Sequence, residues 1–330
     1  MPGVDPDFEM IQGAEGVQLR VAVGGQGPLC VLVHGWPESW YSWRHQIPAL
    51  IAAGYRVAVP DGRGFGGSDK PSEVADYRME LLTADLLALI EHFGEQQVVL
   101  IGHDWGAPVV WHTALRYPER VRAVVGMSVP YLGRGKRPQI ETLRHLYRDR
   151  FFYQLYFEQP GLAELELDQD VRRSLQWLYF GGSAAGRDLQ FLTGAQGREQ
   201  AGLFVGLPDV VPEVPFMSES DLLYYVEQFR PGGFGSSLNR YRNSERDWQW
   251  AGTFDSSLIS QPALFIAGEH DEVLRFAPGV RLDERMEPYF RDLRARHLVP
   301  EAGHWVQQEQ PEWVNRYLLS FLQEISAPVV

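Results

Sequence analysis

The stretch that decides the fold is Val98-Val99-Leu100-Ile101-Gly102-His103-Asp104-Trp105-Gly106-Ala107-Pro108-Val109-Val110. Its first four residues are apolar and rich in β-branched side chains, which predicts a buried strand. The residues from Trp105 onward predict a helix packed against that strand. The spacing Gly102-x-Asp104-x-Gly106 is that of a nucleophile elbow, in which the reacting residue occupies a strained turn between strand and helix.

An aspartate at the centre of this turn favours displacement at a saturated carbon. Attack there converts the carboxylate into an alkyl ester, which an activated water can cleave at the carboxylate's own carbon. A serine that attacked a saturated carbon would leave an ether, which water cannot open. Esterase activity is disfavoured for a separate reason: Asp104 stands where an esterase carries its serine. The alternative for Asp104 taken alone is a helix N-cap, which is common in α/β proteins.

The composition is that of a globular protein of 330 residues, 45% hydrophobic and 12% aromatic, with room for one large core plus an insertion. The formal net charge of -13 argues against nucleic acid or an anionic membrane as a partner. Cys30 is the only cysteine and lies in an apolar run, so we expect a buried, inert thiol and no disulfide. The acidic N-terminus resembles neither a signal peptide nor an anchor, and no apolar run approaches a membrane span, so we expect a cytoplasmic protein.

Strands and helices alternate on both sides of the elbow, which predicts an α/β fold with a parallel strand-helix-strand unit. The expected strands are 8–12, 17–23, 29–34, 56–60, the elbow strand, 121–125, 263–267 and 296–299. The expected helices include 43–53, 80–93 and 311–324. Gly62, Gly64 and Gly67 form a G-x-G-x-x-G motif after a strand, but no apolar helix follows it, so we predict a loop and not a dinucleotide site.

The alternating pattern stops between residues 132 and 250. Helical stretches at 140–147, 171–180 and 222–229 are separated there by Gly- and Pro-rich segments, without a convincing buried strand. The pattern resumes afterwards, so we predict a helical cap at 132–250 inserted into one core made of 1–131 and 251–330.

Two later loops complete a catalytic constellation. Asp271 follows the strand 263–267, and His304 follows the strand 296–299. The chain order Asp104, Asp271, His304 is nucleophile, acid, base, with His304 taking a proton from water and Asp271 holding its tautomer. The loop after the strand 29–34 and the residue after the nucleophile would supply oxyanion-hole N–H groups, which predicts Trp36 and Trp105. Each residue alone is most often structural, but three in this order rarely coincide by chance.

On these residues the chain resembles the epoxide hydrolases of the α/β-hydrolase fold, especially the hydrolase domain of the soluble animal enzymes. The resemblance rests on His34-Gly35-Trp36-Pro37, His103-Asp104-Trp105-Gly106, Gly303-His304-Trp305 and two cap segments, Phe152 to Gly161 and Leu238 to Asn243. It implies an eight-stranded, mostly parallel sheet flanked by helices, and a helical cap. It also implies that Tyr153 and Tyr241 grip the epoxide oxygen, a role that suits a phenol because it stays neutral and can donate a proton.

The resemblance implies conversion of an epoxide to a 1,2-diol through an ester on Asp104, with no metal or organic cofactor. We expect an apolar small-molecule epoxide as substrate and a monomer or homodimer. Further pocket residues are expected to be His34, Pro37, Gln154, Phe157 and Trp305.

Two rival functions stay open at this point. A haloalkane dehalogenase would use the same acid and base, although such enzymes typically carry Asn where Trp36 stands and a halide needs no proton. A protein that keeps the fold but only binds ligands is the rival of another class.

Overall fold

The computed structural model describes residues 6–189, 192–193, 202–254, 258–277 and 279–326. Its strands form one sheet in the order β1-β2-β4-β3-β5-β6-β7-β8. The strands are β1 (Asp7–Gln12), β2 (Gln18–Gly24), β3 (Leu29–Val33), β4 (Arg56–Pro60), β5 (Val98–His103), β6 (Val121–Met127), β7 (Ile259–Gly268) and β8 (Phe290–Val299). Strands β1, β2 and β4 pair antiparallel, and all pairs from β4 to β8 are parallel. The expected fold class is confirmed.

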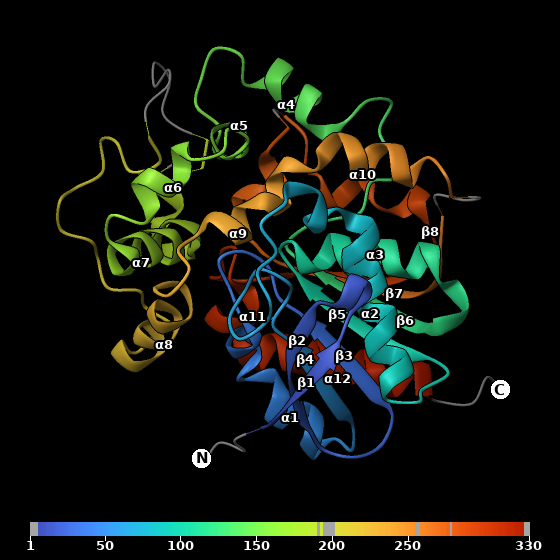
Figure 1. Ribbon diagram of the computed structural model, residues 1–330. Coiled ribbons are helices and arrows are strands. Elements are labelled where there is room, and N and C mark those ends of the chain that lie inside the picture. Colours follow the sequence, from blue (N-terminus) through green and yellow to red (C-terminus); the bar gives the residue numbers. More distant parts are fainter. Residues whose placement is uncertain (1–5, 190–191, 194–201, 255–257, 278, 327–330) are drawn as a thin grey trace.

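Helices cover both faces of this sheet (Figure 1). The flanking helices are α1 (Gln46–Ala52), α2 (Met79–His92), α3 (Gly106–Arg116) and α12 (Pro311–Ser326). Val31 and Leu100 belong to the apolar cluster that includes α2 and α3, whereas Cys30 and Ile101 belong to the cluster that includes α1 and α12. Because the central strands are buried on both faces, they are continuously apolar in sequence. Cys30 is buried, and burial raises the pKa of its thiol to about 12, which keeps it unreactive.

A helical insertion, which we call the cap, lies between β6 and β7. Its helices are α4 (Gln139–Leu146), α5 (Tyr153–Phe157), α6 (Leu162–Leu167), α7 (Val171–Gly182), α8 (Glu219–Phe229), α9 (Gly235–Leu238) and α10 (Ser244–Ala251). Within the described part of the cap there is no strand. Figure 1 shows α5 to α8 gathered to one side of the sheet. The boundaries at 131/132 and 250/251 stay predictions.

A third apolar cluster joins the cap to the core. It includes Tyr153, Phe157 and Tyr241 from the cap and Trp36 and Trp305 from loops of the core. Because these loops follow the carboxyl ends of strands, the cluster lies at the edge of the sheet where α/β folds place their sites. The cap therefore covers the expected catalytic residues.

Two elements differ most from the sequence expectation. The predicted helix 43–53 is a 3₁₀ turn at Trp40–Trp43 followed by α1 from Gln46. Ser39 accepts a hydrogen bond from the N–H of Tyr41 and starts the 3₁₀ turn, and Pro48 is tolerated in the first turn of α1 because that turn needs no N–H donor. The last strand, β8, begins six residues before the predicted position. Its exposed, charged side chains alternate with partly buried ones, as suits an edge strand.

The glycine-rich segment after β4 forms turns and does not enter a helix, as predicted. The carboxylate of Asp61 accepts hydrogen bonds from the N–H groups of Gly67 and Trp40 and pairs with Arg20. An anionic side chain therefore occupies the N–H groups that a phosphate would need. Along the described chain, none of the helices combines the length and apolar character needed to cross a bilayer.

Candidate functional site

Asp104 lies in the tight turn between β5 and α3. Its backbone is left-handed (φ 49°), a conformation that few residues other than glycine adopt. Trp105 is the N-cap of α3, and this helix end has no side-chain cap. The alternative of a helix-capping aspartate is therefore wrong, and the carboxylate is free to face other groups.

Glycines make room for this turn. A Cβ on Gly102 would lie 2.2 Å from the carbonyl oxygen of Gly106, and one on Gly106 would lie 2.0 Å from that of Val33. A Cβ on Gly35 would lie 2.3 Å from Oδ1 of Asp104. Since real Cβ atoms do not approach this closely, the elbow spacing has a direct steric cause.

The sheet brings Asp104, Asp271 and His304 into contact, although they are far apart in sequence. They follow β5, β7 and β8 at the same edge of the sheet. His304 Nε2 lies 3.2 Å from Oδ2 of Asp104, and His304 Nδ1 lies 3.2 Å from both carboxylate oxygens of Asp271. Asp271 also accepts a hydrogen bond from the N–H of Val273, which fixes its orientation. All three catalytic candidates are buried.

The charge state of His304 follows from this arrangement. Burial alone would lower the pKa of the imidazole, but the charge of Asp271 and the hydrogen bonds to Asp104 and Asp271 hold it well above 6.5. His304 is therefore a cation between two anions. An ester on Asp104 would remove one of these anions, and the pKa of His304 would then fall toward that of a general base.

The N–H of Trp36 donates a hydrogen bond of 2.8 Å to Oδ1 of Asp104. This contact arises because β3, which precedes the Trp36 loop, pairs directly with β5. The Trp36 indole donates to Oγ of Ser237 in the cap at 3.0 Å. Trp105 packs its ring edge-on against Tyr241, with centroids 5.2 Å apart. The oxyanion-hole role of its N–H stays a prediction.

The two cap tyrosines lie together, with Tyr153 and Tyr241 ring centroids 5.8 Å apart at 78°. Burial raises the pKa of both hydroxyls, and the charge of Asp104 raises them further, so both stay protonated. Gln154 donates from Nε2 to the hydroxyl of Tyr153 at 2.8 Å. The centroid of the Phe157 ring lies 5.5 Å from that of Tyr153 and 5.1 Å from that of Tyr241, so an apolar ring packs against both tyrosine rings.

Both ring nitrogens of His34 contact backbone. Nδ1 donates to the carbonyl of Gly35 at 2.8 Å, and Nε2 accepts from the N–H of Gly62 at 3.0 Å. The histidine therefore ties the loop after β3 to the loop after β4. Its contact with a substrate stays a prediction.

Pro37 and Trp305 both bond to one cap residue. The Tyr179 hydroxyl donates to the Pro37 carbonyl, and the Trp305 indole donates to the Tyr179 carbonyl, each at 2.9 Å. The Trp305 ring also packs 4.8 Å from the imidazole of His304. These residues hold the cap against the loops that carry the site, and their contact with substrate stays a prediction.

A buried polar network behind His304 was not predicted from the sequence. His103 bonds through Nδ1 to Oε2 of Glu38 and through Nε2 to the carbonyl of His304, both at 2.7 Å. A carboxylate oxygen and a carbonyl oxygen thus lie against the two ring nitrogens of His103. Ser128 donates to the same carbonyl of His304 at 2.8 Å. The signal that the sequence offered was a glutamate in the loop after β3 and a histidine at the end of β5, the neighbouring strand.

This network predicts acid-sensitive stability. Burial would raise the pKa of Glu38, but its pairing with His103 lowers it to about 2. A lowered pKa stabilises the fold above pH 4.5, and that stability is lost as the pH falls toward 2. The Glu38→Gln variant should therefore lose about 3 kcal/mol of unfolding free energy at pH 7. Urea unfolding at several pH values measures this loss.

The loss should shrink as the pH falls from about 4.5 to about 2, since Glu38 becomes protonated in the unfolded chain over this range while the folded protein keeps it ionised. Glu119→Gln, at an exposed glutamate, is the matched control and should change little. A loss for Glu38→Gln that stayed constant down to pH 2.5 would contradict an ionised Glu38 in the folded protein.

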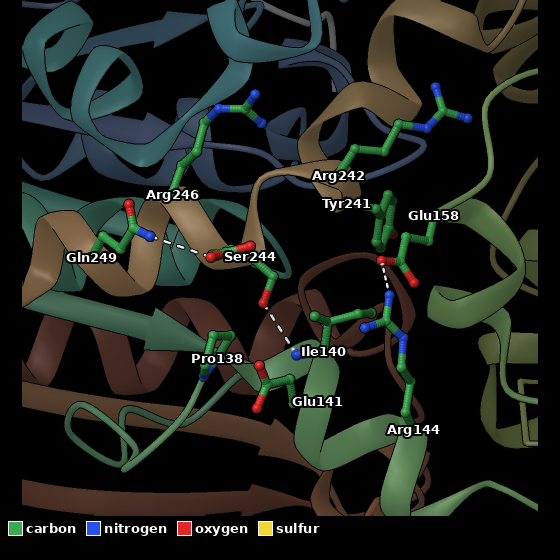
Figure 2. A pocket seen from close by; sticks show the side chains of 11 residues that line it. Pro138, Ile140, Glu141, Arg144, Glu158, Tyr241, Arg242, Ser244, Arg246 and Gln249 are labelled. Carbon is green, nitrogen blue, oxygen red and sulfur yellow. Dashed lines mark hydrogen bonds and ion pairs between the residues drawn. The ribbon is translucent and has the colours of Figure 1, made fainter.

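A pocket of about 330 Å³ lies between α4 and α10 (Figure 2). Arg144, Arg242 and Arg246 line it together with glutamates, and Arg144 pairs with Glu158. Of the predicted site residues, only Tyr241 lines this pocket. The charged lining of the pocket does not suit an apolar ligand, and Asp104, Asp271 and His304 are not among the residues that line it.

The α/β hydrolase fold family matches residues 28–311 of this chain. Epoxide hydrolase A of Mycobacterium tuberculosis is 40% identical over 316 residues, which cover 95% of this chain and 97% of that protein. Bifunctional epoxide hydrolase 2 of Sus scrofa is 40% identical over 309 residues, which cover 93% of this chain. The chain spans about half the length of the pig protein, 54%.

Solved structures of epoxide hydrolases also superpose on this chain. An epoxide hydrolase from an endophytic Streptomyces superposes with a TM-score of 0.90 at 36% identity, covering 98% of this chain and 96% of that one. Epoxide hydrolase A of Mycobacterium thermoresistibile superposes with a TM-score of 0.87 at 40% identity, covering 96% of this chain and 98% of that one.

Proposed function

Because this chain belongs to the epoxide hydrolases of the α/β-hydrolase fold, we propose that it opens an apolar epoxide to a vicinal diol through an ester on Asp104. The chemistry divides into ring opening and ester hydrolysis. Two carboxylates, one histidine and two tyrosines carry it, and the steps need no metal or organic cofactor.

In the first step Oδ2 of Asp104 attacks an oxirane carbon, and the carbon–oxygen bond of the ring breaks. The departing alkoxide takes a proton from Tyr153 or Tyr241, and the second hydroxyl donates a hydrogen bond to it. Oδ1 stays on the N–H of Trp36 and becomes the carbonyl oxygen of the ester. The 2.8 Å bond between these two atoms supports this assignment of the oxygens.

After ring opening, the proton of the His304 imidazolium passes to the tyrosinate, which restores the phenol and leaves a neutral imidazole. In the second step this imidazole takes a proton from a water, which attacks the ester at Cγ of Asp104. The negative oxygen of the tetrahedral intermediate receives hydrogen bonds from the N–H groups of Trp36 and Trp105. Collapse breaks the bond between Cγ and Oδ2, and the leaving alkoxide takes the proton of the new carboxylic acid. The diol therefore departs with one former oxygen of Asp104, and the water oxygen stays in the carboxylate. Asp271 stabilises the imidazolium that forms.

The observation that carries this proposal is the position of Asp104 between the N–H of Trp36 and Nε2 of His304. This position supports both parts of the proposal, attack by the carboxylate and its recovery by water. The indole N–H of Trp36 is bonded to Ser237 and so is engaged within the protein, which disfavours a halide site there. The two protonated tyrosines suit an alkoxide leaving group, which needs a proton that a halide does not.

One turnover in ¹⁸O-labelled water, with enzyme in excess over epoxide, tests the mechanism. The first diol should be unlabelled at its new hydroxyl, and the label should appear in the side chain of Asp104. Mass spectrometry of the diol and of the peptide that contains Asp104 measures both. Label in the first diol would mean that water attacked the ring directly, and halide release without diol formation from matched substrates would indicate a dehalogenase.

A further inference from the structure

Glu309 ends the short helix α11 (Val306–Glu309), which directly follows the loop that carries His304. Its Oε1 accepts hydrogen bonds from the N–H groups of Gly303 (3.1 Å) and Trp305 (3.0 Å). Its Oε2 accepts from the N–H of Gly303 (3.0 Å) and from that of Ala184 (2.9 Å). One carboxylate thus binds the backbone on both sides of the histidine and a residue of the cap.

The cap meets the histidine loop at this point. The N–H of His304 donates to the carbonyl of Gly182, the last residue of α7, at 2.7 Å. A Cβ on Gly303 would lie 2.5 Å from the nitrogen of Ala184 and from the carbonyl oxygen of Gly182, so the two backbones pack without space between them. Glu309, which belongs to the core, accepts hydrogen bonds from both backbones at this contact.

The other end of His304 is held by different groups. Its carbonyl accepts from His103 and Ser128, both in the core. The backbone of His304 is therefore held from the core through its carbonyl and from the cap through its N–H, and the carboxylate of Glu309 bonds both to its two neighbours and to the cap.

We propose that Glu309 is a positioning residue for ester hydrolysis, which holds the general base in place by tying the His304 loop to the end of cap helix α7. The inference rests on the proposed two-step mechanism. Glu309 acts through His304 and touches neither Asp104 nor the tyrosine hydroxyls in the described contacts. Its loss should therefore affect the step that needs a base and spare the step that needs only a nucleophile.

The Glu309→Gln variant tests this role at constant side-chain volume. An amide has one acceptor oxygen, and its NH₂ group would face either the Ala184 or the Trp305 N–H, so one anchor is lost. Ester hydrolysis should slow about 10- to 100-fold, as expected for a misplaced catalytic group, and ring opening should change less than about 3-fold. Single-turnover mass spectrometry, which follows the adduct on Asp104 as it forms and decays, measures both rates.

Steady-state kinetics provide a readout that simple loss of folded protein cannot imitate. When only hydrolysis slows, kcat and KM fall together and kcat/KM stays constant, because kcat/KM reports ring opening. A partly unfolded variant would lose kcat and kcat/KM equally. Unchanged hydrolysis in Glu309→Gln would overturn the inference.

Glu166→Gln is the matched control. Glu166 is also a carboxylate that binds backbone N–H groups, those of Leu203 and Phe204 in the cap, and it makes no described contact with the triad. It should leave the ratio of the two rates unchanged. Should Glu309→Gln not fold, Glu309→Asp replaces it; the shorter side chain cannot span from Ala184 to Trp305, so the same slowing is expected, and its absence would overturn the inference.

The His304→Gln variant separates the two levels of proposal. An adduct there, together with wild-type hydrolysis in Glu309→Gln, would overturn the role of Glu309 alone. No adduct in His304→Gln would overturn the ester mechanism and the role of Glu309 with it.

Discussion

Mixed with a reactive epoxide, the His304→Gln variant should accumulate a covalent adduct on Asp104 while its turnover falls by about 10³-fold or more. Glutamine keeps the site filled but cannot take a proton from water. The carboxylate can still attack, because its Oδ1 keeps the N–H of Trp36. Intact-mass spectrometry should show a gain equal to the whole epoxide, and peptide mapping should place it on Asp104.

The double variant His304→Gln, Asp104→Ala is the control for this experiment. It should gain no mass, because the attacking carboxylate is gone. An unmodified His304→Gln protein, or an adduct that persists in the double variant, would contradict ester formation on Asp104.

Replacing both Tyr153 and Tyr241 by Phe should slow ester formation by about 10⁴-fold, because the opened ring then has no donor for its oxygen. Each single replacement should cost about 10- to 100-fold, since one hydroxyl remains to donate. The rings lie 5.8 Å apart, and their apolar packing is kept in phenylalanine. The rate of adduct formation, measured in the His304→Gln background, isolates this step from hydrolysis.

Tyr156→Phe is the matched control for the tyrosine pair. Tyr156 lies on the same helix, α5, but its hydroxyl donates to Glu166 at 2.9 Å within the cap. It should leave ring opening unchanged. Undiminished adduct formation in the Tyr153, Tyr241 double variant would remove the pair from the mechanism.

The elbow could be predicted from the sequence because its determinants are local. The steric need for Gly102 and Gly106 follows from the turn itself, and a buried strand is recognisable as an apolar run. The triad followed from chain order, because loops after parallel strands converge at one edge of the sheet. Tyr153 and Tyr241 could be selected among 14 tyrosines only through resemblance, because their meeting depends on how the cap folds.

His103 and Glu309, which hold the backbone around His304, could not be predicted in this way. His103 contacts the carbonyl of a residue 201 positions away, and Glu309 contacts Ala184, 125 positions away. Neither pairing leaves a periodic or spaced signal in the chain. The edge strand β8 was underestimated for a related reason: with a neighbour on one side only, it carries charged residues that mask its strand pattern.

The raised pKa of His304 has a consequence for the pH range of ring opening. At neutral pH the resting site already holds a proton on the imidazole, kept there against burial by the neighbouring carboxylates, and one on each tyrosine, kept there by burial and by the charge of Asp104. The alkoxide formed by ring opening can therefore take its proton from these side chains, and no acid from bulk solution is needed. The rate of ring opening should therefore stay constant as the pH is raised, until the tyrosines or His304 begin to lose their protons.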